Sequence, residues 1–305
     1  MLLLVSLSPA QDNKPKHVNK ALELLEQGQP VYYSGGSGGF EQGKKAAQTS
    51  ADYINYELEH GAFDMVELRQ FMLGLVEGGP TKSGHRTPAV IVTLPIHGDD
   101  AAAMRANAWM IQQVLACGVH GILMVHSSSP EAIREFVRAS RYPFAPAAPG
   151  IDEGTRGSGS QSFAARIWGI SSTEYLRRAD PWPLNPDGEL MLGLKIENRH
   201  ALANAEELTR VSGIAFAEWG PGDMGFSLLG LPRGRGGESE RSEPQMVAAR
   251  RRVLEATKAA HIFFLNACSA NTVIDQLKDG TMICTGGDSP AAAKGREYTK
   301  RPQPW

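Results

Sequence analysis

The stretch Leu190-Met-Leu-Gly-Leu-Lys-Ile-Glu-Asn198 is an apolar run that ends in charged and polar residues. An amphipathic stretch over residues 201–211 follows it, then a second apolar run, Ile214 to Trp219, and then Gly-Pro-Gly-Asp223. Short apolar runs separated by helical stretches are typical of parallel strands joined by helical crossovers. We therefore predict two consecutive parallel strands here, with a carboxylate at or just beyond the carboxyl end of each.

The same alternation runs along most of the chain. The eight strands that we predict are Val31–Tyr33, Tyr53–Leu58, Ala89–Leu94, Gly121–His126, Leu190–Ile196, Ile214–Trp219, His261–Asn266 and Met282–Thr285. Helical stretches lie between most of them, for example over residues 102–115, 130–139, 201–211 and 245–260. Eight such units over about 250 residues are typical of a (β/α)8 TIM barrel, an α/β fold. We expect a leader or tail over residues 1–17, one barrel over 18–290, and a polar tail over 291–305.

Composition excludes several classes of protein. The chain has 305 residues, of which 42% are hydrophobic and 21% charged, as in ordinary globular proteins. Lys+Arg 31 against Asp+Glu 33 give a net charge of −2, so we expect neither a nucleic acid nor an anionic membrane surface as a partner. Residues 1–11 hold a short apolar run and Ser-Pro-Ala, an incomplete export signal. We expect a cytoplasmic protein, the alternative being export through a truncated leader.

The three cysteines, Cys117, Cys268 and Cys284, lie far apart and form no Cys-x-x-Cys pair. This spacing indicates neither a disulfide framework nor a thiolate zinc site, and we interpret all three as buried apolar residues.

One segment, Arg141 to Asp187, breaks the alternation. It is rich in proline and glycine and is too long for a passive connection between two elements. We expect it to cover the mouth of the barrel.

Polar residues follow several of the predicted strands at their carboxyl ends, where the side chains of a barrel converge on one mouth. They are Glu59, His60, His97, His126, Lys195, Glu197 and Asp223. Glu197 and Asp223 end consecutive strands, so they can lie side by side and bind a divalent cation. Oxygen ligands suit Mg²⁺ or Mn²⁺, with Co²⁺ a further option. The alternative is that each carboxylate caps a helix or pairs with an arginine such as Arg199.

Around these residues the chain resembles the HpcH/HpaI aldolase family, metal-dependent aldolases of the phosphoenolpyruvate/pyruvate barrel superfamily. The resemblance runs from about Asn19 to Asp288. Its landmarks are Glu57-Leu-Glu-His-Gly61, Ala139-Ser-Arg-Tyr-Pro143, Ala164-Ala-Arg-Ile-Trp-Gly169, Lys195-Ile-Glu-Asn198 and Gly220-Pro-Gly-Asp-Met-Gly-Phe-Ser-Leu-Leu-Gly230. It implies a (β/α)8 barrel whose last helix is often exchanged in a dimer, commonly assembled into a hexamer. It also implies that Glu197 and Asp223 are metal ligands.

The resemblance further implies chemistry at a pyruvate unit. The metal would stabilise an enolate of the 2-oxo acid, and the backbone N–H groups of Gly222 and Asp223 would hold the substrate carboxylate. His60 would move a proton, with Glu59 orienting its ring. The alternative for His60 is an ordinary hydrogen bond to a loop carbonyl.

Two departures from the family pattern affect the predicted site. Val92-Thr-Leu-Pro95 has Thr93, a substrate-binding candidate with only a hydroxyl, where the family usually has an arginine that contacts the substrate. Ala116-Cys117 stands where the family usually has the aspartate that partners the catalytic histidine. The mouth therefore differs from that of a standard member.

Other residues could supply what these positions lack. Lys195 could provide the positive charge or form a Schiff base; the alternative is a structural salt bridge to Glu197 or Glu57. His97 and His126 could contact substrate or assist His60, the alternative being ordinary loop hydrogen bonds.

Three functions follow from these residues. The first is a metal-dependent carbon–carbon lyase that converts 4-hydroxy-2-oxo acids into pyruvate, or an analogue, and an aldehyde. The second is a decarboxylase of 2-oxo acids on the same metal site, and the third is a barrel that binds a 2-oxo acid without turning it over. In each case we expect small-molecule partners, and the resemblance implies further copies of the chain, as a homo-oligomer of two to six subunits.

Overall fold

The computed structural model describes residues 16–230 and 241–303 of the chain. The apolar run over residues 1–11 that we considered as a leader lies outside these residues. Within the two described ranges, no helix is long and apolar enough to cross a membrane.

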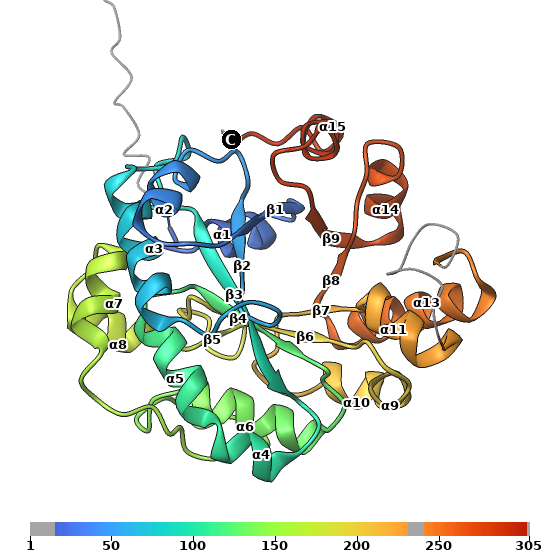
Figure 1. Ribbon diagram of the computed structural model, residues 1–305, viewed down its shortest axis with the longest axis horizontal. Coiled ribbons are helices and arrows are strands. Elements are labelled where there is room, and N and C mark those ends of the chain that lie inside the picture. The colour runs from blue at the N-terminus through green and yellow to red at the C-terminus, as the bar shows by residue number, and fades with distance from the viewer. Residues whose placement is uncertain (1–15, 231–240, 304–305) are drawn as a thin grey trace, which may run out of the picture.

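The strands form one closed parallel barrel (Figure 1). They are β1 (Val31–Gly36), β2 (Tyr53–Glu57), β3 (Ala89–His97), β4 (Gly121–Val125), β5 (Pro181–Trp182), β6 (Leu190–Lys195), β7 (Phe216–Glu218), β8 (Phe263–Asn266) and β9 (Thr281–Thr285). Their order is β4-β3-β2-β1-β9-β8-β7-β6, and pairing of β4 with β6 closes the ring. The two-residue β5 pairs with the start of β6. The predicted barrel and all eight of its strands are confirmed.

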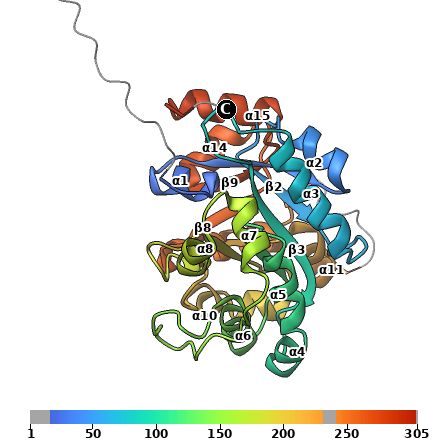
Figure 2. The ribbon, with the colours of Figure 1, turned by 90° about the vertical axis from the view of Figure 1, so that its left-hand side faces the viewer.

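Helices surround the barrel (Figures 1 and 2). They are α1 (Lys20–Glu26), α2 (Phe40–Ala46), α3 (Met65–Glu77), α4 (Ala101–Ala106), α5 (Ala108–Ala116), α6 (Pro130–Ser140), α7 (Gln161–Trp168), α8 (Ser172–Arg178), α9 (Arg199–Ala203), α10 (Ala205–Thr209), α11 (Pro221–Leu229), α13 (Pro244–Ala260), α14 (Val273–Asp279) and α15 (Pro290–Tyr298). Two predicted helical stretches are each divided into two helices, at Asn107 and Asn204. Both asparagines have backbone angles outside the helical range, and asparagine competes with helix formation through its side-chain amide.

Side chains alternate between the two faces of the strands, and this alternation determines where polar groups gather. Residues such as Ile54, Val92 and Leu192 pack outward against the helices, whereas Tyr53, Ile91 and Met191 fill the interior of the barrel. Successive inward positions toward the mouth become polar. They are Asn55 and Glu57 on β2, Thr93 on β3, Lys195 on β6 and Glu218 on β7. The sequence thus forms an apolar floor beneath a charged mouth.

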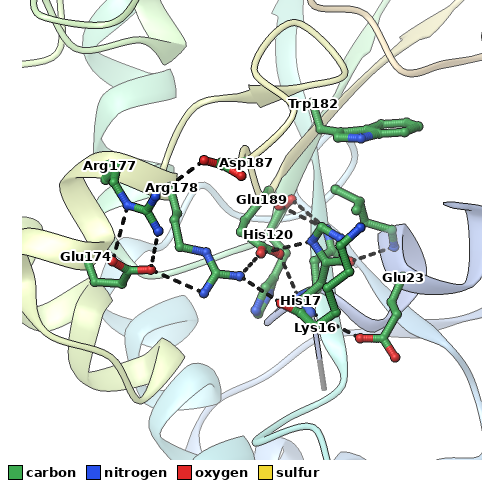
Figure 3. A network of polar contacts seen from close by, with 12 residues as sticks. Lys16, His17, Glu23, His120, Glu174, Arg177, Arg178, Trp182, Asp187 and Glu189 are labelled. Atoms are coloured by element: carbon green, nitrogen blue, oxygen red, sulfur yellow. Dashed lines mark hydrogen bonds and ion pairs between the residues drawn. The ribbon is translucent and has the colours of Figure 1, made fainter. Parts of the chain in front are cut away.

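The expectation that residues 141–187 cover the mouth is wrong, because this segment lies at the opposite end of the barrel. The Trp168 indole donates to the carbonyl of Gly118, which precedes β4, at 2.9 Å. Arg178 pairs with the buried Glu189, which precedes β6 (Figure 3). A connection that leaves a helix and enters a strand starts from the amino end of the barrel, so its position follows from the topology.

Figure 3 shows how this segment is fixed to the beginning of the described chain. Nδ1 of His17 lies 3.1 Å from Oε1 of Glu189, the same carboxylate that pairs with Arg178. His17 Nε2 also lies 3.1 Å from Oε2 of Glu26 on α1. These ion pairs join α1 to α8 beneath the barrel, away from the polar mouth.

Two further expectations need correction. Cys268 and Cys284 form a disulfide, whereas Cys117 is free and buried as predicted. The bond forms because β8 and β9 pair side by side, which brings residues distant in sequence together. The expected polar tail over residues 291–305 contains most of α15, which packs against its own barrel, and the buried Arg301 lies 2.7 Å from Asp52. Buried apolar and ion-paired side chains hold this segment in place.

Candidate metal centre at the barrel mouth

Four side chains converge at the mouth, each with one ligand atom within 4.8 Å of the others. They are Glu59 after β2, His126 after β4, Glu197 after β6 and Asp223 in the first turn of α11. The predicted carboxylate pair, Glu197 and Asp223, therefore lies together. Glu59 and His126, for which we predicted other roles, join the same cluster.

Glu197 is buried, and its position is fixed from two sides. Its Oε1 accepts a hydrogen bond of 2.7 Å from the backbone N–H of His126. On the other side lies Gly220, with φ of 48°, where a Cβ would stand 2.6 Å from Oε2 of Glu197. Burial raises the pKa of the Glu197 carboxyl to about 8, and the nearby Lys195 only partly offsets this. A carboxylate removed from water in this way fits a site that a divalent cation would complete.

Asp223 lies where helix α11 begins. The first backbone bond of that helix runs from the N–H of Met224 to the carbonyl of Gly220, at 3.0 Å, so the N–H groups of Gly222 and Asp223 precede it. A Cβ at Gly222 would meet nothing within 4 Å, which leaves its backbone open to approach. This geometry is compatible with anion binding by the two N–H groups, which stays a prediction.

His126 has a left-handed backbone conformation, with φ of 45°, that is uncommon for a residue with a Cβ. Its Nδ1 lies 3.5 Å from Oε1 of Glu197, and its Nε2 lies 4.0 Å from Oε1 of Glu59. The His97 ring packs against it with 4.4 Å between centroids. Burial and the His97 ring both lower the pKa of His126, which favours a neutral imidazole with a free nitrogen lone pair.

Lys195 forms an ion pair with Oε2 of Glu59. The expected alternative, a structural salt bridge of Lys195, is therefore present, but its partner is Glu59 and not Glu197 or Glu57. Burial by itself would lower the pKa of Lys195, but the carboxylates of Glu218, Glu197 and Glu59 raise it above its ordinary value. Lys195 is therefore an ammonium, which is a poor nucleophile for a Schiff base.

Sequence reasoning missed Glu218. It lies directly opposite Lys195 in the parallel pairing of β6 with β7. A single charged residue in the apolar run Ile214–Trp219, two positions after the inward Phe216, was the available signal.

Comparison with known proteins identifies aldolases that are similar in sequence to part of this chain. No protein-family model matches the chain. The hydroxypyruvate/pyruvate aldolase of Deinococcus radiodurans is 33% identical over 153 residues, 50% of this chain and 48% of that protein. The 2-keto-3-deoxy-L-rhamnonate aldolase of Klebsiella pneumoniae is 32% identical over 158 residues, 52% of each chain. The matched region thus spans about half the length of these curated relatives. Over the matched region the chain is similar in sequence to these aldolases.

The fold agrees with that relation. The crystal structure of the HpcH/HpaI aldolase from Desulfitobacterium hafniense superposes with a TM-score of 0.65, at 21% identity, over 92% of this chain and 96% of the other. At this identity the superposition shows a shared barrel and nothing about activity.

Three residues that we predicted at the mouth lie outside the four-residue cluster. The His60 side chain is 75% exposed, with Nε2 3.7 Å from Oε1 of Glu59. His97 contributes its ring to His126 and is 57% exposed. Thr93 is buried, and its hydroxyl donates to Oδ1 of Asn55 at 3.0 Å, so it is engaged within the barrel wall. Their roles toward a substrate stay predictions.

Proposed function

We propose that this chain is a divalent-metal-dependent carbon–carbon lyase that acts on 4-hydroxy-2-oxo acids and releases pyruvate, or a close analogue, and an aldehyde. The observation that carries the proposal is the convergence of Glu197 and Asp223 at the carboxyl ends of the strands, where barrel enzymes place their chemistry. The names of the two curated relatives, a hydroxypyruvate/pyruvate aldolase and a 2-keto acid aldolase, support the substrate class.

In this proposal Glu197 and Asp223 hold Mg²⁺ or Mn²⁺, with Co²⁺ a further option. A bound cation would supply Lewis-acid stabilisation of the negative charge that develops on the 2-oxo acid. The N–H groups of Gly222 and Asp223 bind the substrate carboxylate at the start of α11. Lys195 provides a positive charge at the mouth in place of the arginine of the family, and it pairs with Glu59.

The proton-transfer role falls to His60 in this proposal. Its exposed ring can approach an aldol hydroxyl from the solvent side, and Oε1 of Glu59 lies 3.7 Å from its Nε2. His97, His126 and Thr93 are the further residues that we proposed for contact with substrate. The cluster geometry supports a role for His126 close to the reacting atoms.

The test uses protein stripped with a chelator and reloaded with Mg²⁺ or Mn²⁺. We expect metal-dependent release of pyruvate from 4-hydroxy-2-oxo acids of some chain length, and its loss in Glu197→Gln and Asp223→Asn. Absence of release for every chain length would overturn the proposal. Loss of CO₂ from oxaloacetate without aldol cleavage would instead support the decarboxylase.

A second measurement separates an enzyme from a binding protein. Solvent hydrogen exchange at C3 of pyruvate requires that the site remove a proton from the bound 2-oxo acid. Exchange that needs metal and Glu197 supports the lyase, whereas pyruvate binding without exchange would support the non-catalytic barrel.

We also propose a homo-oligomer of two to six subunits. Exposed aromatic side chains, among them Trp109, Phe144 and Phe226, support subunit contacts. Light scattering on the purified protein tests this, and a monomeric mass would contradict it.

For localisation we propose the cytoplasm, the alternative being export through a truncated leader. The Cys268–Cys284 disulfide supports export, because disulfides persist mainly in oxidising compartments. Fractionation of cells that produce the full chain decides between the two.

A further inference from the structure

We infer that His126 is a direct ligand of the metal at this mouth and that its imidazole shifts the selectivity of the site from Mg²⁺ toward borderline cations such as Co²⁺ and Ni²⁺. The inference rests on the metal site of the proposed function and adds a nitrogen donor to its carboxylate pair. Mg²⁺ is bound by oxygen ligands and keeps several waters, whereas imidazole suits the later transition metals. The identity of one ligand therefore changes which cation the protein takes up.

One ring nitrogen of His126 lies at a distance from Glu197 that fits two donors sharing a cation. Nδ1 of His126 lies 3.5 Å from Oε1 of Glu197, which is longer than an ordinary hydrogen bond of about 3 Å. With metal–ligand bonds of about 2.1 Å, ligands at right angles lie about 3 Å apart and opposite ligands about 4.2 Å apart. The four donor atoms lie within 4.8 Å of one another, slightly wider than this range, so a bound cation would draw them closer together.

The backbone holds the ring in this place. The N–H of His126 donates to Oε1 of Glu197 at 2.7 Å, and the N–H of Ser127 donates to the carbonyl of Lys195 at 3.0 Å. The end of β4 is thus tied to the end of β6, where Glu197 follows. The left-handed turn at His126 brings its imidazole into the mouth beside the carboxylates.

Charge balance leaves room for a neutral ligand. Oε2 of Glu59 is paired with Lys195, so that carboxylate is already compensated. Glu197 and Asp223 contribute two negative charges, which match a divalent cation. An imidazole would add a ligand to such a cation without adding charge.

The decisive variant is His126→Asn. Asparagine tolerates the left-handed conformation, and its backbone N–H can still donate to Glu197. The substitution therefore replaces the imidazole and leaves the backbone contact in place. The matched control is His261→Asn, which removes an imidazole from another left-handed backbone position, at the end of α13 and outside the cluster. Metal-free wild type and both variants are titrated with Co²⁺ and with Mg²⁺ at one fixed pH, by calorimetry and by the visible absorption of bound Co²⁺.

We expect the wild type to bind Co²⁺ more tightly than Mg²⁺. In His126→Asn the Co²⁺ affinity should fall about tenfold or more with a changed absorption spectrum, while the Mg²⁺ affinity changes by less than about twofold. His261→Asn should leave both affinities unchanged. Unchanged Co²⁺ affinity and spectrum in His126→Asn would overturn the inference.

A measurement on the histidine-labelled wild type covers the case in which His126→Asn does not fold. Zn²⁺ should shift the ¹⁵N resonances of one imidazole that titrates with the metal, and the same shift should persist in His97→Asn. No ring-nitrogen shift at saturating Zn²⁺ would overturn the inference. The proposed function fails separately, if Glu197→Gln and Asp223→Asn retain full metal affinity.

Discussion

Gly220 lies directly against the side chain of Glu197, because a Cβ at Gly220 would stand 2.4 Å from the Cβ of Glu197. With φ of 48°, Gly220 also has a backbone conformation that side chains disfavour. The turn after β7 therefore approaches the end of β6 closely enough to place Asp223 beside Glu197. The close approach of these two strand ends brings the carboxylates that follow β6 and β7 into one candidate metal site.

Gly220→Ala should damage the site more than the fold. We expect metal affinity to fall at least about tenfold, because Glu197 must move, and the free energy of unfolding to fall by about 1–3 kcal/mol from backbone strain. Calorimetry with Mn²⁺ and urea unfolding measure the two effects. The matched control is Gly222→Ala, where a Cβ would meet nothing within 4 Å, and its metal affinity should stay near that of the wild type. Equal effects of the two substitutions would contradict the relation.

The ion pair of Lys195 with Glu59 gives a prediction about stability. Both side chains are largely buried, so Lys195→Met should lower the free energy of unfolding by about 3 kcal/mol, because it leaves Glu59 as a buried, uncompensated charge. The double variant Lys195→Met with Glu59→Gln should recover part of this loss. Urea unfolding of the wild type, Lys195→Met, Glu59→Gln and the double variant gives the coupling free energy between the two side chains. Additive losses of stability would show that the pair is not coupled.

Lys195 also gives a prediction about chemistry. The surrounding carboxylates keep it protonated, so we expect borohydride with pyruvate to leave the mass of the protein unchanged. An adduct on Lys195 would overturn the metal-based proposal in favour of a Schiff base.

Sequence reasoning was most successful where a feature is local along the chain. Each strand and the residue that ends it could be predicted, and so could the proximity of Glu197 and Asp223 at consecutive strand ends. The position of residues 141–187 was predicted wrongly, although a helix-to-strand connection belongs at the amino end of the barrel.

Other features depend on which strands become neighbours and in what register. The positions of His126 beside Glu197 and of Glu218 opposite Lys195 follow from strand pairing. The disulfide likewise depends on strand pairing. Asn266 on β8 is aligned with Cys284 on β9, and Cys268 follows Asn266 by two residues. Periodicity in one sequence does not contain this information.

His120, at the opposite end of the barrel from the mouth, should make stability depend on pH. Burial lowers its pKa to about 3, with a further contribution from His85, and its Nδ1 accepts a hydrogen bond of 3.1 Å from the N–H of Val90. Between pH 3 and 6.5 the unfolded chain binds a proton that the folded chain does not, so this residue lowers stability as pH falls. The free energy of unfolding changes by at most about 1.4 kcal/mol per pH unit in this range. Above the unfolded pKa of about 6.5, His120 is neutral in both states and no longer lowers stability.

His120→Gln should remove this slope. Urea unfolding of wild type and variant between pH 4.5 and pH 7, about two units within that window, gives the difference between the two slopes, so that other titrating groups cancel. Parallel slopes would show that His120 does not carry the dependence.

The Cys268–Cys284 disulfide should contribute to stability and should be visible in the number of free thiols. Its sequence separation is 16 residues, and closing a loop of that size stabilises a protein by about 3 kcal/mol. We expect Cys268→Ala with Cys284→Ala to lower the free energy of unfolding by about that amount, and Cys117→Ser to serve as the thiol control. Denatured, unreduced protein should react with iodoacetamide at Cys117 alone, whereas reduced protein should react at all three cysteines. Three reactive thiols before reduction would exclude the bond, and an unchanged stability of the double variant would exclude its stabilising role.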